Sequence, residues 1–387
     1  MISFTNTQIA FAHLSSKELL RAKKLFTIIS MPLIMSVWHF LLRIAPKLGI
    51  DIRPSIYKHF IGGESLEECK PIVEKLWNYR IYSIPYHSVE SVESDSSILE
   101  NYREIYNNIQ FSIGNPKIAF TVFRPTCIIS SRILCLVSEN AMLNSKDEQE
   151  YSEFKGRVDA LCELSYNGNK PILIDAKESW YQKAIDDLVD GMMAKYNKSR
   201  AIVYRSFQMY QTGALERIFR SHRNSLEENY ILGAVIVRGA YMGKERNRAA
   251  KMNYKLPIYD TKAETDRAFN EAVKFALSNI DSISVFCGTH NEDSIIYLIS
   301  LMESLSIAKN DDRVFFAQLY GMSNNISLNL ADAGFNVAKY VPYGSLSDVL
   351  PYLMRRSQDN ISIHGQTGRE LNYIKKEVRR RRYHRDE

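Results

Sequence analysis

The chain has 387 residues, of which 45% are hydrophobic, 24% charged and 11% aromatic. This composition is typical of a globular protein and excludes a collagen, a coiled coil, a disulfide-stapled miniprotein and a largely disordered chain. The net charge is +6, but seven Lys or Arg against three acids in residues 375–387 supply +4 of it, which leaves +2 for the rest. The body of the protein is therefore close to neutral and offers no broad basic face for a nucleic acid.

The first stretch to weigh is residues 25–42, an apolar run interrupted by Pro32 and His39. We expect a packed helix pair broken at the proline, and a membrane-associating or spanning segment is the alternative. The preceding residues, 15–24, are polar and of mixed charge, unlike a secretory signal peptide. Further along, Ser65 precedes Glu68 by three residues, which predicts a capped helix start.

The region up to residue 110 reads as mainly helical, with one short apolar run, 81–84, that suits a strand. Downstream, short apolar runs alternate with amphipathic stretches, which predicts βα units around a parallel sheet. The predicted strands are 118–123, 171–175, 201–207, 231–237, 284–288, 314–319 and 336–341. The helical stretches include 182–196, 264–277, 294–305 and 347–356.

A doubly wound sheet and a closed barrel both fit this alternation. The chain lacks GxGxxG after the first strand and lacks GxxxxGK[ST], the phosphate loops common in open sheets. Nearly every apolar run also ends in a polar cluster, as expected at the mouth of a barrel. We therefore expect an α/β protein with a distorted (β/α)8 TIM-like barrel. The predicted division is a helical region, 1–110, a barrel, 111–372, and a basic C-terminal tail, 373–387, that is solvated or attracted to an anionic surface.

Several polar and aromatic residues at these strand ends are candidates for chemistry. Arg124 and Arg238 follow strands, and Arg355 and Arg356 form a pair that can grip one carboxylate or phosphate. Tyrosines that can wall a pocket, or fill the core, are Tyr241, Tyr320, Tyr340, Tyr343 and Tyr352. The run Thr289, His290 and Asn291 offers hydrogen bonds to a ribose or phosphate. No GxSxG, HExxH or metal-binding pattern is present, five scattered cysteines favour free thiols in a reducing compartment, and no metal is expected.

The order of several longer strings closely resembles the proline dehydrogenase family, in its single-function bacterial form. They are VRGAYMGKERNRA (237–249), DTKAETDRAFNEA (260–272), GTHNEDS (288–294), FAQLYGMSNNIS (316–327) and KYVPYGSLSDVLPYLMRRSQDN (339–360). The strings GQTGREL (365–371), IGGESLEEC (61–69) and residues 173–204 extend the resemblance over nearly the whole chain.

The resemblance implies a barrel that holds FAD, oxidises L-proline to Δ1-pyrroline-5-carboxylate and passes electrons to a membrane quinone. By the same resemblance, Arg355 and Arg356 match the pair that grips the proline carboxylate, and Arg124 and Asp175 match charged positions at the carboxylate end. Positions that enclose the pyrrolidine ring correspond to Tyr340, Tyr352 and Leu319. Positions at the flavin correspond to Gln208, Arg238, Gly239, Ala240, Tyr241, Thr289, His290 and Asn291.

The chain departs from the family pattern at several of these places. Arg124 stands where Lys is usual, Lys177 reverses a charge in the DAE pattern, and Asp359 shortens a Glu. Val235 replaces a basic residue that approaches the flavin N5, and Pro85 or Tyr86 replaces an Asp. Loss of one such hydrogen bond would cost about 1.5–3 kcal/mol, a tenfold to hundredfold effect on rate.

Three interpretations stay open at this stage. The first is an active, slower proline dehydrogenase; the second is a flavin-binding barrel paralogue with another substrate or weak activity; the third is a non-catalytic binding protein. Use of quinone would favour peripheral contact with a membrane, through residues 25–42 or the basic tail. A cytoplasmic location is expected, with the inner membrane face as a docking place and a mitochondrial matrix as the alternative.

Overall fold

The computed structural model describes residues 2–29, 58–89, 92, 95–346, 348–349, 352 and 366–383. The chain has the predicted (β/α)8 fold, with eight parallel strands in the order β1-β8-β7-β6-β5-β4-β3-β2. The strands are β1 (Ile81–His87), β2 (Thr121–Phe123), β3 (Ile172–Ile174), β4 (Val203–Gln208), β5 (Leu232–Val237), β6 (Ile283–Gly288), β7 (Val314–Leu319) and β8 (Val337–Tyr343). The predicted strands are thus confirmed, and β7 has the predicted bounds.

These segments form strands because they are short, nearly continuous apolar runs rich in β-branched residues, the pattern of a parallel sheet covered on both faces. All six residues of β4 are buried, and only the last residue of β5 is partly exposed. The strand β1 lies upstream of residue 111, the expected start of the barrel, and pairs with β8 along its whole length. The chain divides into two compact units, residues 1–89 with 318–387 and residues 90–317.

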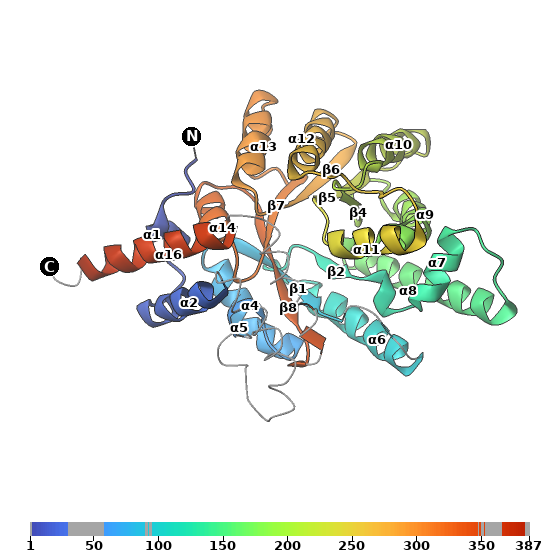
Figure 1. The fold of residues 1–387 in the computed structure, drawn as a ribbon, viewed down its shortest axis with the longest axis horizontal. Helices are drawn as coiled ribbons and strands as arrows, with labels where there is room; N and C mark the ends of the chain where they lie inside the picture. Colours follow the sequence, from blue (N-terminus) through green and yellow to red (C-terminus); the bar gives the residue numbers. More distant parts are fainter. Residues whose placement is uncertain are drawn as a thin grey trace. The chain divides into compact units, whose positions relative to one another are not determined.

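The unit of residues 90–317 contains β2 to β6, most of β7 and the helices that cover them. Helices α9, α10, α12 and α13 lie outside these strands (Figure 1). An aromatic cluster links three of the strands, since Phe120 makes edge contacts with Tyr204, Phe286 and Phe315 at centroid distances of 5.4, 5.0 and 4.9 Å. The helices of this unit are α6 (Asp95–Ser112), η3 (Pro125–Cys127), α7 (Ser131–Ser138), α8 (Ser145–Asn167), α9 (Ser179–Tyr196), α10 (Ala214–Glu227), α11 (Met242–Met252), α12 (Lys262–Ser278) and α13 (Glu292–Ser304).

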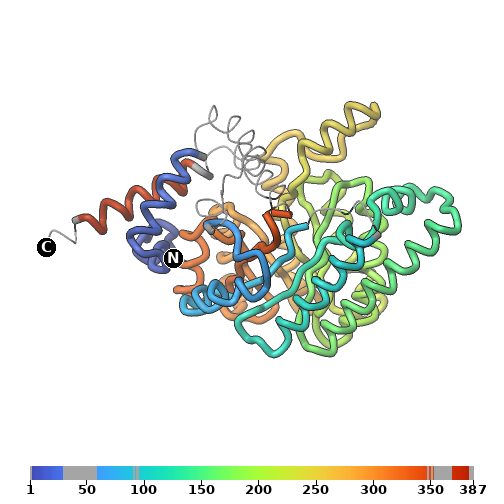
Figure 2. Tube along the Cα trace, turned by 90° about the horizontal axis from the view of Figure 1, so that it is seen from below, coloured from blue at the N-terminus to red at the C-terminus, as the bar shows by residue number. Residues whose placement is uncertain are grey.

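The other unit contains β1, β8 and the helices from both ends of the chain. These helices are α1 (Thr7–Ala10), α2 (Ser16–Ile29), α4 (Lys58–Phe60), α5 (Leu66–Trp77), α14 (Asn324–Asp332) and α16 (Gln366–Tyr383). The predicted cap of α5 is confirmed, because the Ser65 side chain accepts a hydrogen bond from the Glu68 backbone N–H. Helices α2 and α16, from opposite ends of the sequence, lie side by side (Figures 1 and 2).

Residues 373–383 of the predicted basic tail, expected to be solvated or attracted to an anionic surface, belong to helix α16. Glu377 is fully buried and accepts hydrogen bonds from Arg380 and Arg381 at 2.8 Å. The Arg381 guanidinium also donates to the carbonyl oxygens of Leu14 (2.8 Å) and Phe11 (2.7 Å). The basic residues of this helix therefore fasten the C-terminal segment to the N-terminal one.

Replacing Glu377 by Gln should lower the free energy of unfolding by about 1–3 kcal/mol, because the charge-assisted bonds to two arginines are lost while the shape is kept. Urea unfolding measures the change. Glu303→Gln, at an exposed position of α13, is the matched control and should have little effect. Equal midpoints for Glu377→Gln and the native protein would contradict the structural role of this carboxylate.

Two sequence expectations fall wholly or partly outside the described residues. Of the apolar stretch 25–42, residues 25–29 belong to α2, and Pro32 and the segment after it lie outside the described part. Most of the predicted helix 347–356 lies outside it as well. None of the helices in the described ranges combines the length and the apolar character that a bilayer span requires.

Candidate active site

In the unit of residues 90–317, the predicted residues Arg124 and Asp175 form an ion pair at the ends of neighbouring strands. Arg124 follows β2 and is 5% exposed, and its Nε lies 3.8 Å from Oδ2 of Asp175, which follows β3. The Asp175 backbone N–H donates to the Phe123 carbonyl at 3.1 Å, which fixes the register of the two strand ends. The structure therefore places the predicted mouth carboxylate directly beside the predicted arginine.

Arg238 binds three side chains at the ends of the next strands. It follows β5 and donates from Nε to Asp266 Oδ1 (2.8 Å), from Nη1 to the Thr289 hydroxyl and from Nη2 to Ser294 Oγ (2.7 Å). Its guanidinium also lies 4.2 Å from the centroid of the Phe269 ring. Two of the predicted flavin residues, Arg238 and Thr289, are thus in direct contact.

The other two residues of the Thr289–Asn291 run have different surroundings. The Asn291 side-chain oxygen accepts the Ser294 backbone N–H at 3.0 Å and so caps α13. Its backbone N–H donates to the Thr289 hydroxyl at 3.2 Å. His290 is half-buried at the end of the same strand. The sequence reasoning did not anticipate the capping role of Asn291, although Asn is among the residues preferred at the N-cap of a helix.

The segment after β5 follows a backbone path that requires glycine. Gly239 has φ of +123°, and a Cβ there would lie 2.3 Å from the Tyr210 ring. Ala240 is half-buried, and Tyr241 is 5% exposed at the start of α11. On the neighbouring strand, Gln208 is 4% exposed and donates from Nε2 to the Lys177 carbonyl at 2.7 Å.

Lys177, which reverses a charge of the family pattern, is buried and not exposed to solvent. It is 3% exposed, and its Nζ lies 3.6 Å from Glu178 Oε2 and 4.9 Å from the centroid of the Tyr241 ring. Lys244 approaches the other carboxylate oxygen of Glu178 at 2.6 Å. Burial opposes ionisation of Glu178, but the charge of Lys177 and the hydrogen bond from Lys244 together hold its pKa below the usual value.

Replacing Lys177 by Met should lower the free energy of unfolding at pH 7 by about 1–3 kcal/mol, because Glu178 then keeps one cation instead of two. The folded pKa of Glu178 is depressed, so its ionisation stabilises the fold above the unfolded pKa of the carboxyl. This contribution is lost as pH falls through the folded pKa. The difference between variant and native protein should therefore shrink towards the acid end.

Urea unfolding between neutral pH and the lowest pH at which the native protein stays folded measures this trend. Lys183→Met, which breaks an exposed pair with Asp187, is the control and should cost well under about 1 kcal/mol. A pH-independent effect of Lys177→Met would remove the assigned role of the Glu178 pair.

Val235, where the family usually carries a basic residue, is an ordinary core residue here. It is 1% exposed and lies in register with Ser206 of β4 and Phe286 of β6. No cation can be supplied from this position. Lys177 follows β3, two strands away from β5 in the order of the sheet. It brings a positive charge to a position where the family pattern has a negative one.

In the unit of residues 1–89 and 318–387, aromatic side chains gather beside β8. The Tyr86 ring makes edge contacts with the rings of Tyr340 and Tyr352, each at a centroid distance of 6.3 Å. Tyr86 and Tyr352 are 3% and 2% exposed, whereas Tyr340 is half-buried. Two of the predicted ring-enclosing residues are thus brought together, and Tyr86, which the sequence marked only as a departure, joins them.

Leu319, the third predicted ring-enclosing residue, ends β7 and is held by a buried lysine. Lys339 is 1% exposed and donates from Nζ to the carbonyls of Leu319 (3.2 Å) and Met322 (2.7 Å). The Tyr320 backbone N–H donates to the Tyr340 carbonyl at 2.9 Å. Lys339 therefore fixes the backbone of residues 319–322, which include the candidate residues Leu319 and Tyr320. A Lys inside an apolar strand could have signalled such a role.

The arginine pair lies outside this description. Arg355, Arg356 and the departure Asp359 fall in residues that the structure does not describe. Of the remaining predicted tyrosines, Tyr343 is 1% exposed with its ring 5.5 Å from that of His87, and Tyr320 lines a separate cavity described below. The carboxylate grip of the arginine pair stays a prediction.

A family model described as proline dehydrogenase matches residues 70–369. The chain belongs to the proline dehydrogenase family. Among the curated members is proline dehydrogenase 1, mitochondrial, of Dictyostelium discoideum, 31% identical over 385 residues, which cover 88% of this chain and 67% of that protein. The carbapenem antibiotics biosynthesis protein CarD of Pectobacterium carotovorum is 29% identical, over 83% of each chain.

Solved structures of this family share the fold. The chain superposes on the proline utilization A (PutA) protein from Bdellovibrio bacteriovorus, inactivated by N-propargylglycine, with a TM-score of 0.78 at 17% identity. The match covers 94% of this chain but only 42% of that one, so the chain spans less than half of the PutA protein. This likeness confirms the barrel fold.

The strand-end residues fit the flavin that the family implies. A flavin adenine dinucleotide presents carbonyl, hydroxyl and phosphate oxygens, and β4 to β6 end in an amide, a guanidinium, a hydroxyl and an imidazole, from Gln208, Arg238, Thr289 and His290. Gly239 is exposed at the end of β5, and its missing side chain leaves room for the Tyr210 ring. The donor set is polar and cationic, as an anionic cofactor requires.

Proposed function

We propose that the protein is an FAD-dependent proline dehydrogenase that oxidises L-proline to Δ1-pyrroline-5-carboxylate. The observation that carries the proposal is the family match over residues 70–369, which includes the strand ends that bear the polar candidates. Membership of the family alone leaves the substrate open, since a relative with 29% identity, CarD, is named for carbapenem antibiotics biosynthesis and not for proline oxidation. The charged and aromatic residues favour proline itself.

Proline has one carboxylate and one apolar ring, and the candidate residues match both. Arg355 and Arg356 bind the carboxylate through paired guanidiniums. Tyr340, Tyr352 and Leu319 contact the pyrrolidine ring, and Tyr86 and Lys339 hold these three in place through the contacts described above. Arg124 and Asp175 form a charge pair at the carboxylate end.

Gln208, Arg238, Tyr241, Thr289 and His290 hold FAD, which supplies a hydride acceptor for the carbon next to the proline nitrogen. The protein contributes orientation: Asp266 and Ser294 fix the guanidinium of Arg238, and the guanidinium in turn fixes the Thr289 hydroxyl. Val235 brings no positive charge, so a slower reaction than in members with a lysine there is expected.

Quinone as electron acceptor and a peripheral position on a membrane belong to the proposal, as does a cytoplasmic location. Quinone use follows from the family chemistry, because electrons from the flavin need an acceptor. A quinone that resides in a membrane in turn favours the peripheral position. The relatives named proline dehydrogenase 1 are mitochondrial by name, which keeps the matrix as the alternative.

Purification in the presence of FAD tests the proposal. We expect a yellow protein with the two absorption bands of an oxidised flavin. With L-proline and an artificial electron acceptor it should form a cyclic imine that o-aminobenzaldehyde traps as a coloured adduct. A protein that retains flavin but forms no imine would support the paralogue with another substrate, and a folded protein that binds no flavin would leave only a non-catalytic role.

A further inference from the structure

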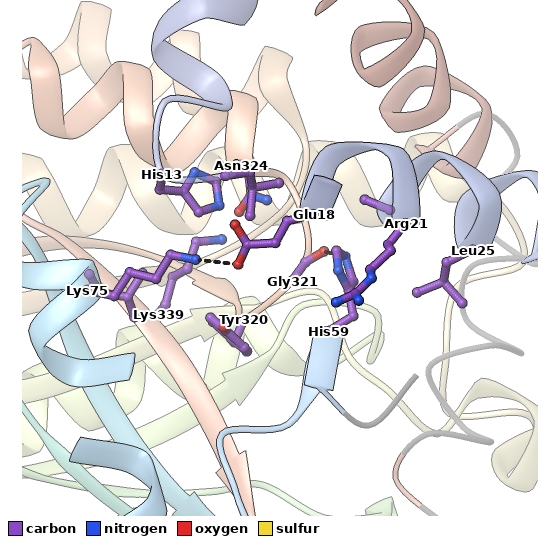
Figure 3. Close-up of a pocket in the computed structure, with 13 residues that line it drawn as sticks. His13, Glu18, Arg21, Leu25, His59, Lys75, Tyr320, Gly321, Asn324 and Lys339 are labelled. Atoms are coloured by element: carbon purple, nitrogen blue, oxygen red, sulfur yellow. Dashed lines mark hydrogen bonds and ion pairs between the residues drawn. The ribbon is translucent and has the colours of Figure 1, made fainter. Parts of the chain in front are cut away.

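A cavity of about 140 Å³ lies within the unit of residues 1–89 and 318–387, apart from the aromatic cluster of Tyr86, Tyr340 and Tyr352. It is lined by residues of α2 and the segment before it, of α4, α5 and β8, and of the segment between β7 and α14 with the first residue of α14 (Figure 3). This volume holds several waters or one small ion. The basic or amide side chains around it are His13, Arg21, His59, Lys75, Asn324 and Lys339.

Several of these groups have no partner within the described residues. The Asn324 side chain is 95% buried and its amide forms no hydrogen bond there, although it points towards His13 and Glu18 (Figure 3). The Nδ1 atom of His13 is buried without a partner. Arg21 is exposed at the side of the cavity, and its guanidinium forms no ion pair with the described residues. Buried polar groups are normally hydrogen-bonded, so these call for a ligand or water.

Among the described residues that line the cavity, the carboxylate of Glu18 is already engaged. Glu18 accepts a hydrogen bond from the Ser15 backbone N–H at 2.7 Å and from Lys75 Nζ at 3.1 Å. These hydrogen bonds and the charge of Lys75 overcome the effect of burial and lower the pKa of Glu18 to about 2. What remains for a ligand is therefore a set of donors and positive charge without a free acidic partner.

The basic groups also disfavour one another's charge. Burial, with the charges of Lys339 and Lys75, lowers the pKa of His13 to about 3, and burial with Lys339 lowers that of His59 to about 4. Burial lowers the pKa of Lys339 to about 7, against the attraction of Glu370 from α16. An anion in the cavity would reverse this repulsion and favour the protonated forms.

The backbone at the cavity is fixed tightly enough to hold a ligand in place. Gly321 has φ of +77°, and a Cβ there would lie 2.2 Å from the His59 carbonyl oxygen. The His59 Nε2 atom and the Gly321 carbonyl are 3.0 Å apart. Lys339 joins the same segment through the carbonyls of Leu319 and Met322.

We propose that this cavity is a binding site for a small oxyanion, a tetrahedral ion or a carboxylate, held by Arg21, His13 and Asn324. The ligand would supply the acceptors that Asn324 and His13 lack, and a negative charge for Arg21, which forms no ion pair with the described residues. The site is separate from the proposed oxidation of proline and does not depend on it.

Isothermal titration of the full chain with sulfate, and separately with acetate, tests the proposal at constant ionic strength set with chloride. Both probes stay almost fully ionised between pH 6 and 8, so their own protonation changes the affinity very little. Saturable binding of either probe is expected, tighter at pH 6 than at pH 8 because Lys339 takes up a proton. Binding of sulfate alone would assign a tetrahedral ion, and binding of acetate alone a carboxylate.

Two variants of α2, at Arg21 and Lys17, and one of α14, at Asn324, localise the site. Arg21→Ala should weaken binding at least about fivefold through loss of a charge-assisted contact. Lys17→Ala removes the same charge from an exposed position of α2 outside the cavity and should change the affinity less than about twofold. Asn324→Ala should weaken binding without any change of charge. Absence of saturable binding of both probes, or equal losses for Arg21→Ala and Lys17→Ala, would overturn the proposal.

Discussion

Replacing Arg355 or Arg356 by Met is expected to raise KM for L-proline by about 10- to 150-fold, with a much smaller effect on kcat. In the proposed function each guanidinium contributes charge-assisted hydrogen bonds to the substrate carboxylate, worth about 1.5–3 kcal/mol. The carboxylate does not take part in the oxidation of the ring, so its binding is the same in the ground state and the transition state. The loss should therefore fall on KM.

Steady-state kinetics with an artificial electron acceptor measure both constants. Arg379→Met, the same substitution at an exposed position of α16, is the matched control and should leave KM within about twofold. If both arginine variants keep the native KM, the pair does not bind the carboxylate and the assignment of the substrate loses its main support.

Replacing Arg238 by Met should cost about 2–4 kcal/mol of folding free energy and release FAD. The substitution leaves Asp266, Thr289 and Ser294 without their common donor, and Asp266 keeps only its ion pair with Lys262. Loss of three hydrogen bonds from a charged group is costly at a partly buried site. Because the Thr289 hydroxyl is fixed through the same guanidinium, both of the proposed cofactor contacts should be lost together. Arg238→Lys keeps the charge but cannot donate to all three side chains at once. Its stability and its flavin retention should therefore lie between those of Arg238→Met and those of the native protein.

Urea unfolding of the apoprotein measures the stability, and the flavin absorbance after gel filtration measures retention. Arg313→Met, which breaks surface pairs with Asp311 and Asp281, is the control and should cost at most about 1 kcal/mol. Full flavin retention in Arg238→Met would mean that this residue serves the fold and not the cofactor.

The strands were predictable because the strands of a parallel sheet covered by helices on both faces appear in the sequence as short apolar runs. The segment Val314–Leu319 is such a run, and it was predicted to the residue. Strand β2 ends at the predicted residue, where the chain turns into η3, but it begins three residues later than predicted. Its start is delayed by a turn in which the Ile118 backbone N–H donates to the Asn115 carbonyl at 3.3 Å. Strand ends depend on such turns, which periodicity does not reveal.

The C-terminal helix shows where charge counting misleads. Its many arginines suggested a solvated tail, yet Leu371, Ile374 and Val378 are buried on one face. Their spacing of three and four residues is the signal of a packed helix, and it was outweighed by the charge. The arginines reach over this apolar face to Glu377 and to backbone carbonyls.

The candidate site was predictable by residue type but not by pairing. The order of the strands implies that Arg124 and Asp175 lie near one another, but the 3.8 Å contact needs side-chain positions. The burial of Lys177 beside Glu178, and the threefold binding by Arg238, depend on helices α11 to α13, which pack from elsewhere in the sequence. The sequence alone could not show that a reversed charge is balanced by its own neighbour.

Rapid anaerobic mixing of the flavin-loaded protein with L-proline tests the central claim most directly. We expect the main visible absorption band of the oxidised flavin to bleach in a proline-dependent, saturable phase, whereas glycine, which has the carboxylate but no ring, should leave it unchanged. A flavin that stays oxidised at every proline concentration, in a folded and fully loaded protein, would contradict the assignment of this chain as a proline dehydrogenase.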